Sequence, residues 1–264
     1  MLNNPTQVAR DISRWMLQEL EESGQECFVV GVSGGVDSAV VYRLAQMTGK
    51  PVHPIFMPFN QRQHDDLCGL VRELTGLDVM REVEIGLWCE GIDNIFSVEE
   101  TGAMGLSDLA VGNFAARMRM NFLYLMATVL KGIVVGTTNA AEWYIGYYTK
   151  YGDGGVDIEP ICGLLKHEVY QLGREGFTTP VPASILNAEP SANLWKGQTD
   201  EGELGFTYDE LDAWISQGVE SMVPIPIIDR IVAMHHATDH KRNQPGHCCV
   251  SGQDCPVCTH LYNE

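Results

Sequence analysis

The sequence predicts an α/β protein built on a doubly wound parallel sheet flanked by helices. Short apolar runs rich in β-branched residues alternate with segments of helical periodicity, which is the pattern of strand–helix–strand units. Two of these runs, 27–32 and 132–137, are apolar at nearly every position, as is typical of strands covered on both faces. A Gly-Gly turn joins the first run directly to a helix.

The individual elements follow from periodicity and from the residues that interrupt it. Strands are expected at 27–32, 52–57, 79–85 and 132–137. Helices are expected at 12–20, 37–48, 65–75, 113–130, 166–174, 208–217 and 225–236. Three segments rich in Gly or Pro are expected to be less regular: 90–112 as a helix with a mobile loop, 146–160 as a loop at the ligand edge, and 180–204 as an ordered loop or lid.

Length and charge limit the classes of function. The chain has 264 residues, and we expect one domain over 1–245 followed by a Cys-rich tail over 246–264. The formal charge of −18 repels nucleic-acid phosphates, so a stable complex with tRNA or DNA is not expected. A small anionic ligand remains compatible with this charge if its site is locally basic.

Nothing in the sequence predicts export or membrane insertion. Residues 1–22 have the pattern of an amphipathic helix and not of a signal peptide. The most apolar long stretch, 118–135, is interrupted by Arg119 and Lys131. The eight cysteines do not require an oxidising compartment, so we expect a cytoplasmic protein.

The turn after the first strand has the composition of a phosphate-binding loop. Gly34 and Gly35 permit unusual backbone angles and a close approach to a phosphate. Ser33 and Ser38 add hydroxyl donors, and Asp37 suggests a bound Mg²⁺ because a bare carboxylate would repel phosphate. The alternative is a Gly-rich turn that only begins a helix. The loop is not a Walker loop, which requires Gly-Lys-Ser/Thr at its end.

Five segments together resemble one known family. The loop Ser33-Gly34-Gly35-Val36-Asp37-Ser38 resembles that of the N-type ATP pyrophosphatases. The stretch 136–166, which contains T-K-Y-G-D-G-G, is similar to the signature of NAD synthetases. Segments 113–124 and 190–205, and the motif His-Lys-Arg at 240–242, are similar to later motifs of that family, the second to its archaeal-type short members. The resemblance covers about residues 8 to 245, in order.

This resemblance implies an adenine nucleotide alpha hydrolase-like, Rossmann-like fold and a definite reaction. The family adenylates the nicotinate carboxylate of deamido-NAD with ATP and then lets ammonia displace AMP. The chain is too short to hold a glutaminase domain as well, so the resemblance implies the ammonia-dependent form, with a separate glutaminase as one conceivable ammonia source. It also implies a homodimer with the dinucleotide site at the interface.

The resemblance assigns roles to individual positions. The expected ATP-binding residues are Gly31, Ser33, Gly34, Gly35, Asp37, Ser38, Thr137, Lys166 and Ser191. The expected deamido-NAD-binding residues are Asn113, Arg117, Tyr147, Lys150, Asp157, His240 and Lys241. Asp37 and Glu142 are the expected Mg²⁺ ligands, and Asp153 and Lys166 the expected catalytic residues.

Several of these assignments have alternatives. Asp153 is expected to take a proton from ammonium, but Asp-Gly is also a common turn pair. Glu142 has the alternative of a carboxylate favoured at a helix N-terminus. Arg117 and Arg119 are two positions apart on a helix and cannot point the same way, so one is expected at the dinucleotide and the other elsewhere. Arg62 and Gln63 match the adenine-contacting segment only loosely.

The tail departs from the family pattern. Cys248, Cys249, Cys255 and Cys258, with a nearby histidine, are a possible Zn²⁺ site, and a mobile tail with free or redox-active thiols is the alternative. Two other functions compete with the leading one. One is a related ATP pyrophosphatase that amidates another acid or thiolates tRNA. The other is a catalytically silent nucleotide sensor, against which the presence of Asp37, Glu142 and Lys166 argues.

Overall fold

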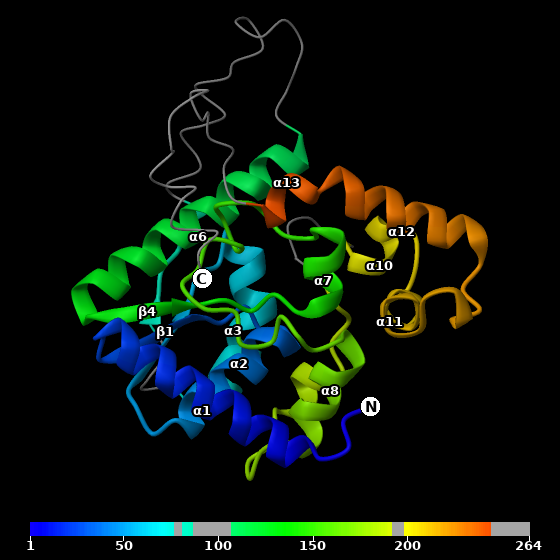
Figure 1. The fold of residues 1–264 in the computed structure, drawn as a ribbon. Coiled ribbons are helices and arrows are strands. Elements are labelled where there is room, and N and C mark those ends of the chain that lie inside the picture. Colours follow the sequence, from blue (N-terminus) through cyan, green and yellow to red (C-terminus); the bar gives the residue numbers. More distant parts are fainter. Residues whose placement is uncertain (77–80, 87–106, 192–197, 244–264) are drawn as a thin grey trace, which may run out of the picture.

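The computed structural model describes residues 1–76, 81–86, 107–191 and 198–243. Its centre is a parallel four-stranded sheet in the order β3-β2-β1-β4 (Figure 1). The strands are β1 (Cys27–Gly31), β2 (Val52–Phe56), β3 (Arg81–Glu82) and β4 (Gly132–Val135). All four lie within the expected runs, so the strand predictions are confirmed for the described residues.

Side chains of β1, β2 and β4 alternate between two hydrophobic cores, one on each face of the sheet. Phe28 and Val30 belong to one core, and Val29 between them belongs to the other. The first core receives α1 (Pro5–Ser23), α2 (Val36–Met47), α3 (Gln61–Thr75) and α8 (Lys166–Glu175). The second is covered by α6 (Asp108–Leu130). Because both faces are buried at β1 and β4, these two strands carry no charged residue, whereas the edge strand β3 consists of the exposed Arg81 and Glu82.

The order of the strands brings two loops together. β1 lies between β2 and β4, so the chain leaves β1 towards β2 on one side and returns to its other side as β4. Parallel strands end at the same edge, and the turns after β1 and β4 are therefore neighbours at a topological switch point. This edge is where ligands bind in open α/β sheets.

A third cluster of apolar side chains lies beside the sheet. It joins α7 (Ala140–Ile145), α10 (Asp200–Leu204), α11 (Tyr208–Gln217) and α12 (Ile225–Ala237). The chain also forms α9 (Ala183–Leu186), the 3₁₀ turn η1 (Gly218–Glu220) and α13 (Asp239–Arg242). In Figure 1, α10, α11 and α12 lie to one side of the sheet, next to α7.

The predicted long helices are confirmed, and the short ones were missed. α6 begins at Asp108, five positions before the expected start, because Ser107 caps it by accepting a hydrogen bond from the Ala110 amide at 3.2 Å. α7, α9 and α10 have four to six residues each, too few to show a helical period in sequence. The mobile-loop prediction for 90–112 and the tail predictions fall largely outside the described residues.

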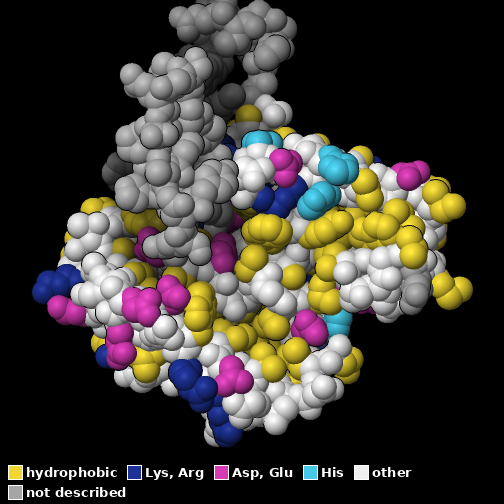
Figure 2. All heavy atoms as spheres, in the orientation of Figure 1, with side chains coloured by type: hydrophobic (Ala, Val, Ile, Leu, Met, Phe, Trp, Pro, Cys, Tyr) yellow, Lys and Arg dark blue, Asp and Glu magenta, His cyan; other side chains and the backbone are white. Residues whose placement is uncertain are grey.

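The surface is acidic in keeping with the composition. On the face shown in Figure 2, acidic side chains are scattered over the surface and apolar side chains gather over α12. None of the helices that the structure describes is both long and apolar enough to cross a membrane.

Candidate active site

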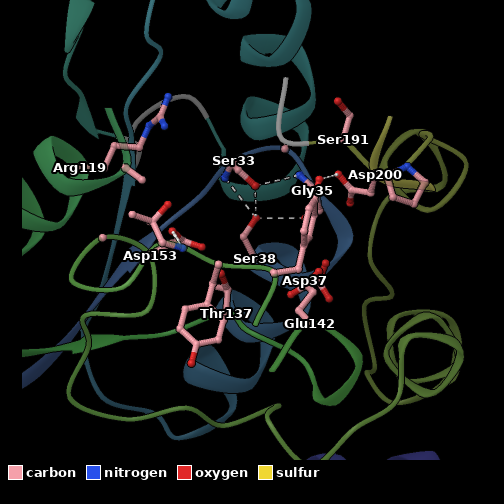
Figure 3. Close-up of a pocket in the computed structure, with 18 of the residues that line it drawn as sticks. Ser33, Gly35, Asp37, Ser38, Arg119, Thr137, Glu142, Asp153, Ser191 and Asp200 are labelled. Atoms are coloured by element: carbon pink, nitrogen blue, oxygen red, sulfur yellow. Dashed lines mark hydrogen bonds between the residues drawn. The ribbon is translucent and has the colours of Figure 1, made fainter. Parts of the chain in front are cut away.

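The turn after β1 is held in shape by its own serines. The Ser33 amide donates to Ser38 Oγ at 3.1 Å, and Ser38 Oγ donates to the Gly35 carbonyl at 3.0 Å. The Gly35 amide donates to Ser33 Oγ at 3.2 Å. Gly34 lies at φ +87°, in the region that favours glycine. The loop is thus fixed by local bonds at the start of α2, where the helix dipole favours an anion (Figure 3).

A buried ion cluster lies beside this loop. Lys166, the first residue of α8, places Nζ 2.7 Å from Asp37 Oδ2 and 3.1 Å from Glu142 Oε1. Only 4% of the Lys166 side chain is exposed. The Asn139 amide group donates to Asp37 Oδ1 at 2.9 Å, and the Tyr208 ring centre lies 4.6 Å from Nζ. Three segments distant in sequence therefore meet at one ammonium group.

Burial and charge set the protonation of this cluster. Burial opposes the charged form of Lys166, but the attraction of Asp37 and Glu142 outweighs it and raises the pKa of Lys166 above its ordinary value. Burial raises the pKa of Glu142 to about 7, although Lys166 acts in the opposite direction. Lys166 is therefore charged at neutral pH, and burial makes Glu142 easier to protonate than an ordinary carboxylate.

Glu142 also caps α7. Its Oε2 accepts from the Asn139 amide at 3.2 Å, and Asn139 Oδ1 accepts from the Glu142 amide at 3.0 Å. This reciprocal pair is a capping box. The two readings of Glu142 from sequence are therefore compatible, because one carboxylate oxygen caps the helix and the other faces Lys166.

A cavity of about 690 Å³ opens over the loop and the ion cluster. Its volume falls within the range of small-molecule sites. It is lined by most of the residues expected from sequence, namely Gly31, Ser33, Gly34, Gly35, Asp37, Ser38, Asn113, Thr137, Glu142, Tyr147, Asp153, Lys166, Ser191 and Lys241. In Figure 3, Arg119 and Asp153 lie on one side of Ser33, with Asp37, Glu142 and Asp200 on the other.

Four expected residues do not line this cavity: Arg117, Lys150, Asp157 and His240. Asp157 accepts from Tyr124 Oη at 3.0 Å and from the Val134 amide at 2.7 Å, so its carboxylate ties β4 to α6. Lys150 Nζ donates to the backbone carbonyl of His240. Their expected contacts with a dinucleotide stay predictions.

Arg119 lines the cavity where Arg117 was expected. Arg119 Nε donates to the Met57 carbonyl at 3.0 Å, and its guanidinium donates to Gln63 Oε1 at 3.2 Å. Gln63 lines the cavity as well, while Arg62 pairs with Asp66 on the surface of α3. The expectation that the two arginines of α6 diverge is confirmed, since Arg117 is exposed.

Asp153 shapes its turn and lines the cavity, while its expected role in taking a proton from ammonium stays a prediction. Its Oδ1 accepts from the Thr149 amide at 2.9 Å, which shapes the Gly-rich turn. Its side chain keeps exposed surface at the cavity, and desolvation by the surrounding turn still raises its pKa above the ordinary value of a carboxyl. On the same rim, Lys241 Nζ donates to the carbonyls of Gly146 at 2.6 Å and Tyr148 at 2.5 Å.

Sequence reasoning missed two acids near the site, the buried Asp200 and the half-buried Glu159. Asp200 lines the cavity from α10 and accepts from Tyr208 Oη at 3.1 Å. Glu159 accepts from the Thr138 amide at 3.2 Å, and burial raises its pKa to about 8. Its carboxylate lies so close to Gly136 that a Cβ there would come within 2.4 Å of it. In the sequence, this contact is indicated only by Gly136, the residue type that leaves room for the carboxylate.

Comparisons with known proteins agree with this geometry. The NH(3)-dependent NAD(+) synthetase of Alkaliphilus metalliredigens is 40% identical over 257 residues, covering 90% of this chain and 98% of that protein. The protein of the same name from Thermoplasma acidophilum is 38% identical and covers 82% of this chain and 88% of its own length.

Two solved structures are also similar. The NMN synthetase of Francisella tularensis superposes with a TM-score of 0.81 at 34% identity, over 93% of this chain and 98% of that one. An NH3-dependent NAD synthetase from Campylobacter jejuni has a TM-score of 0.70 at 23% identity, covers 94% of this chain and 100% of that one, and shows the shared fold. The sequence model of the NAD synthase family matches residues 8–245. The chain therefore belongs to the NAD synthase family.

Proposed function

We propose that this chain uses ATP to activate a nicotinate carboxylate and amidates it with ammonia, converting deamido-NAD to NAD with release of AMP and pyrophosphate. One observation supports this most: a charged, buried Lys166 lies between Asp37 and Glu142, directly beside a preformed anion-binding loop. Adenylation brings two anions together, so it requires concentrated positive charge and aligned donors.

The phosphates of ATP bind to the loop Ser33–Ser38 and to Lys166. Gly31, Thr137 and Ser191 line the same cavity and contact the nucleotide. Asp37 and Glu142 offer oxygen ligands of the type that Mg²⁺ prefers. Bound there, Mg²⁺ would neutralise charge on the leaving pyrophosphate. The ammonium group of Lys166 contacts both carboxylates in this structure. Once both carboxylates bind Mg²⁺, the ammonium group turns to the bound phosphates.

Asp153 serves the ammonia step. A carboxylate with a raised pKa binds ammonium and accepts its proton, leaving neutral NH₃ to attack the acyl carbon. Asp153 lies with Arg119 on the side of the cavity away from Asp37 in Figure 3, so that ammonia and the leaving pyrophosphate are kept apart. The remaining expected contacts, Asn113, Tyr147 and Lys241, line the part of the cavity in which the nicotinate nucleotide binds.

A mononucleotide acid is the second candidate substrate. The similarity to an NMN synthetase, with a TM-score of 0.81 and 34% identity, favours testing nicotinate mononucleotide beside deamido-NAD. The chemistry at the carboxylate is identical, and only the second nucleotide of the acid differs. Four expected residues lie outside the cavity lining: Arg117, Lys150, Asp157 and His240. We expect them to contact the acid only if its second nucleotide is bound.

The test is a direct comparison of the two acids. Purified chain, ATP, Mg²⁺ and ammonium are mixed with deamido-NAD or with nicotinate mononucleotide, and AMP and the amide product are measured. We expect AMP and NAD in equal amounts from deamido-NAD. Product from the mononucleotide alone would replace the substrate assignment and keep the adenylation chemistry. No AMP with either acid would contradict the proposal.

We also propose that the chain forms a homodimer. α6 exposes Leu125 and Val129, one helical turn apart on the same face, at 55% and 68%, which is costly for an isolated surface helix. Covering this face with a second copy would bring two cavities to one interface. Light scattering of the purified chain tests this, and a monomer at assay concentration would contradict it.

A further inference from the structure

Three potential metal ligands converge outside the active site. His64 and Cys68 lie one helical turn apart on α3, and Glu82 lies on the edge strand β3. One ligand atom from each residue lies within 4.8 Å of the other two. Positions i and i+4 of a helix share a face, so the imidazole and the thiol point to the same neighbour. None of these residues lines the catalytic cavity.

The spacing of the ligand atoms suits a tetrahedral ion. His64 Nε2 lies 3.2 Å from Glu82 Oε1. Metal–ligand bonds of about 2.0 Å to nitrogen and oxygen imply a separation of roughly 3.3 Å between those two atoms in a tetrahedral site. The Cys68 side chain is 5% exposed, so its sulfur approaches from the protein interior.

The other nitrogen of His64 is held in the way that metal-ligating histidines are held. His64 Nδ1 lies 3.2 Å from Asp65 Oδ1. A carboxylate at the second nitrogen orients the ring, so that Nε2 faces the space beside Glu82, and Gln61 Nε2 lies 3.4 Å from the same Nδ1. Asp65 in turn accepts from Gln61 at 2.7 Å, so the carboxylate is itself oriented.

We propose that His64, Cys68 and Glu82 form a Zn²⁺ site, with a water molecule as the fourth ligand. Thiolate, imidazole and carboxylate together are a donor set that Zn²⁺ accepts, whereas Mg²⁺ and Ca²⁺ select oxygen ligands alone. The alternative is a surface ion pair between His64 and Glu82, with Cys68 serving only as a packing residue of the first core.

The site connects the edge of the sheet to the catalytic cavity. β3 has two described residues and pairs only with β2 among the described strands, so a metal bond from Glu82 to α3 anchors that edge. Gln63, adjacent to His64, lines the cavity and accepts from the Phe59 amide at 2.7 Å. Zn²⁺ at His64 therefore fixes the first turn of α3, which forms one wall of the cavity.

The test is a Co²⁺ titration of the full-length chain after removal of bound metal. Co²⁺ replaces Zn²⁺ in such sites, and its bond to a thiolate gives a near-ultraviolet charge-transfer band. To exclude the tail, all variants carry Ser in place of its four cysteines, Cys248, Cys249, Cys255 and Cys258. In this background we expect one Co²⁺ per chain and a thiolate band.

Matched variants assign the band to its ligands. Cys68→Ser should remove it, while Cys162→Ser, which changes a half-buried thiol elsewhere, should leave it unchanged. Glu82→Gln alters an accessible strand residue without risk to the core and should weaken Co²⁺ binding at least tenfold. Asp65→Asn should weaken it by roughly ten- to a hundredfold. Far-ultraviolet circular dichroism checks that each variant is folded.

Two results would overturn the proposal. One is the lack of a thiolate band in the background protein at stoichiometric Co²⁺. The other is a band that persists in Cys68→Ser and an affinity unchanged in Glu82→Gln. Either result would reduce the cluster to an ion pair beside a buried thiol. The outcome is independent of the amidation assay, since it is read from metal binding alone.

Discussion

The two sides of the catalytic cavity are built in different ways. On one side, the turn Ser33–Ser38 is shaped by bonds between residues at most five positions apart. On the other side, Lys166 reaches Asp37 at the end of this turn across 129 positions, and Tyr208 meets Glu142 across 66. A local motif thus faces a cluster that exists only once the whole domain has folded.

This difference separates binding from stability. The loop is partly exposed to solvent, and its backbone amides that face the cavity form hydrogen bonds with a phosphate only when ATP binds. Substitutions in the loop should therefore affect ATP binding before they affect stability. The ion cluster is buried, and an unpaired charge there costs free energy whether or not substrate is present. Substitutions in the two regions should therefore divide into those that alter the KM for ATP and those that alter unfolding.

The largest effect is expected from Lys166→Met. It leaves Asp37 and Glu142 buried without their cation, which should lower the free energy of unfolding by roughly 3–5 kcal/mol. It should also abolish AMP formation, because the phosphates lose their buried positive charge. Denaturant unfolding followed by circular dichroism measures the first effect, and the AMP assay measures the second.

A double variant separates the two consequences. Lys166→Met combined with Glu142→Gln removes one of the stranded charges, so it should recover part of the lost stability. It should not recover activity. If the double variant is no more stable than Lys166→Met, the charge balance inferred for this side of the cavity is wrong.

The second effect is a pH dependence of stability caused by Glu159. Its pKa is about 8 in the folded protein against 4.5 ordinarily. The folded state thus binds more protons than the unfolded one between these values, and stability is lost as the pH rises towards about 8. The loss should be on the order of a few kcal/mol.

The variant Glu159→Gln isolates this contribution. Urea midpoints measured across the pH window should decline more steeply for the parent than for the variant. Parallel declines would mean that Glu159 does not carry the dependence. Glu142 and Asp153, whose pKa values are also raised, remain in both proteins and supply the shared slope.

The same division explains what the sequence could predict. The phosphate loop, β1, β4 and the long helices follow from local patterns of glycine and apolar residues. Resemblance to the family predicted that Asp37, Glu142 and Lys166 belong to one site, and the structure brings them together. Without that resemblance, nothing in their spacing would have connected them.

Other features could not be predicted because they depend on packing between distant segments. Asp200 belongs to a Pro- and Gly-rich stretch without periodicity. Its carboxylate accepts hydrogen bonds from Tyr208 and Tyr147, which come from other elements. Glu159 gives only an indirect signal through Gly136. Arg117 and Arg119 are equivalent in sequence until the position of α6 against the sheet is known.

A smaller effect is expected at the local side of the cavity. Gly34→Ala places a side chain at φ +87°, which should cost roughly 1–2 kcal/mol and raise the KM for ATP. Gly69→Ala is the matched control, since Gly69 lies in α3 with no atom within 4 Å of the added Cβ. That control should gain up to about 1 kcal/mol and leave the KM unchanged. Equal losses in both variants would contradict the strain at Gly34.

The smallest expected effect compares the two arginines of α6. Arg119 lines the cavity and is held by Met57 and Gln63, whereas Arg117 is exposed. Arg119→Met should lower kcat/KM by roughly tenfold, about 1.4 kcal/mol of transition-state stabilisation. Arg117→Met should lower kcat/KM for deamido-NAD only if a second copy of the chain brings Arg117 to the dinucleotide. It should leave kcat/KM for nicotinate mononucleotide unchanged. A loss of activity in Arg117→Met with both acids would show that the cavity within one chain is not the whole site. Arg117 would then act at the carboxylate that the two acids share, and not only on the second nucleotide of deamido-NAD.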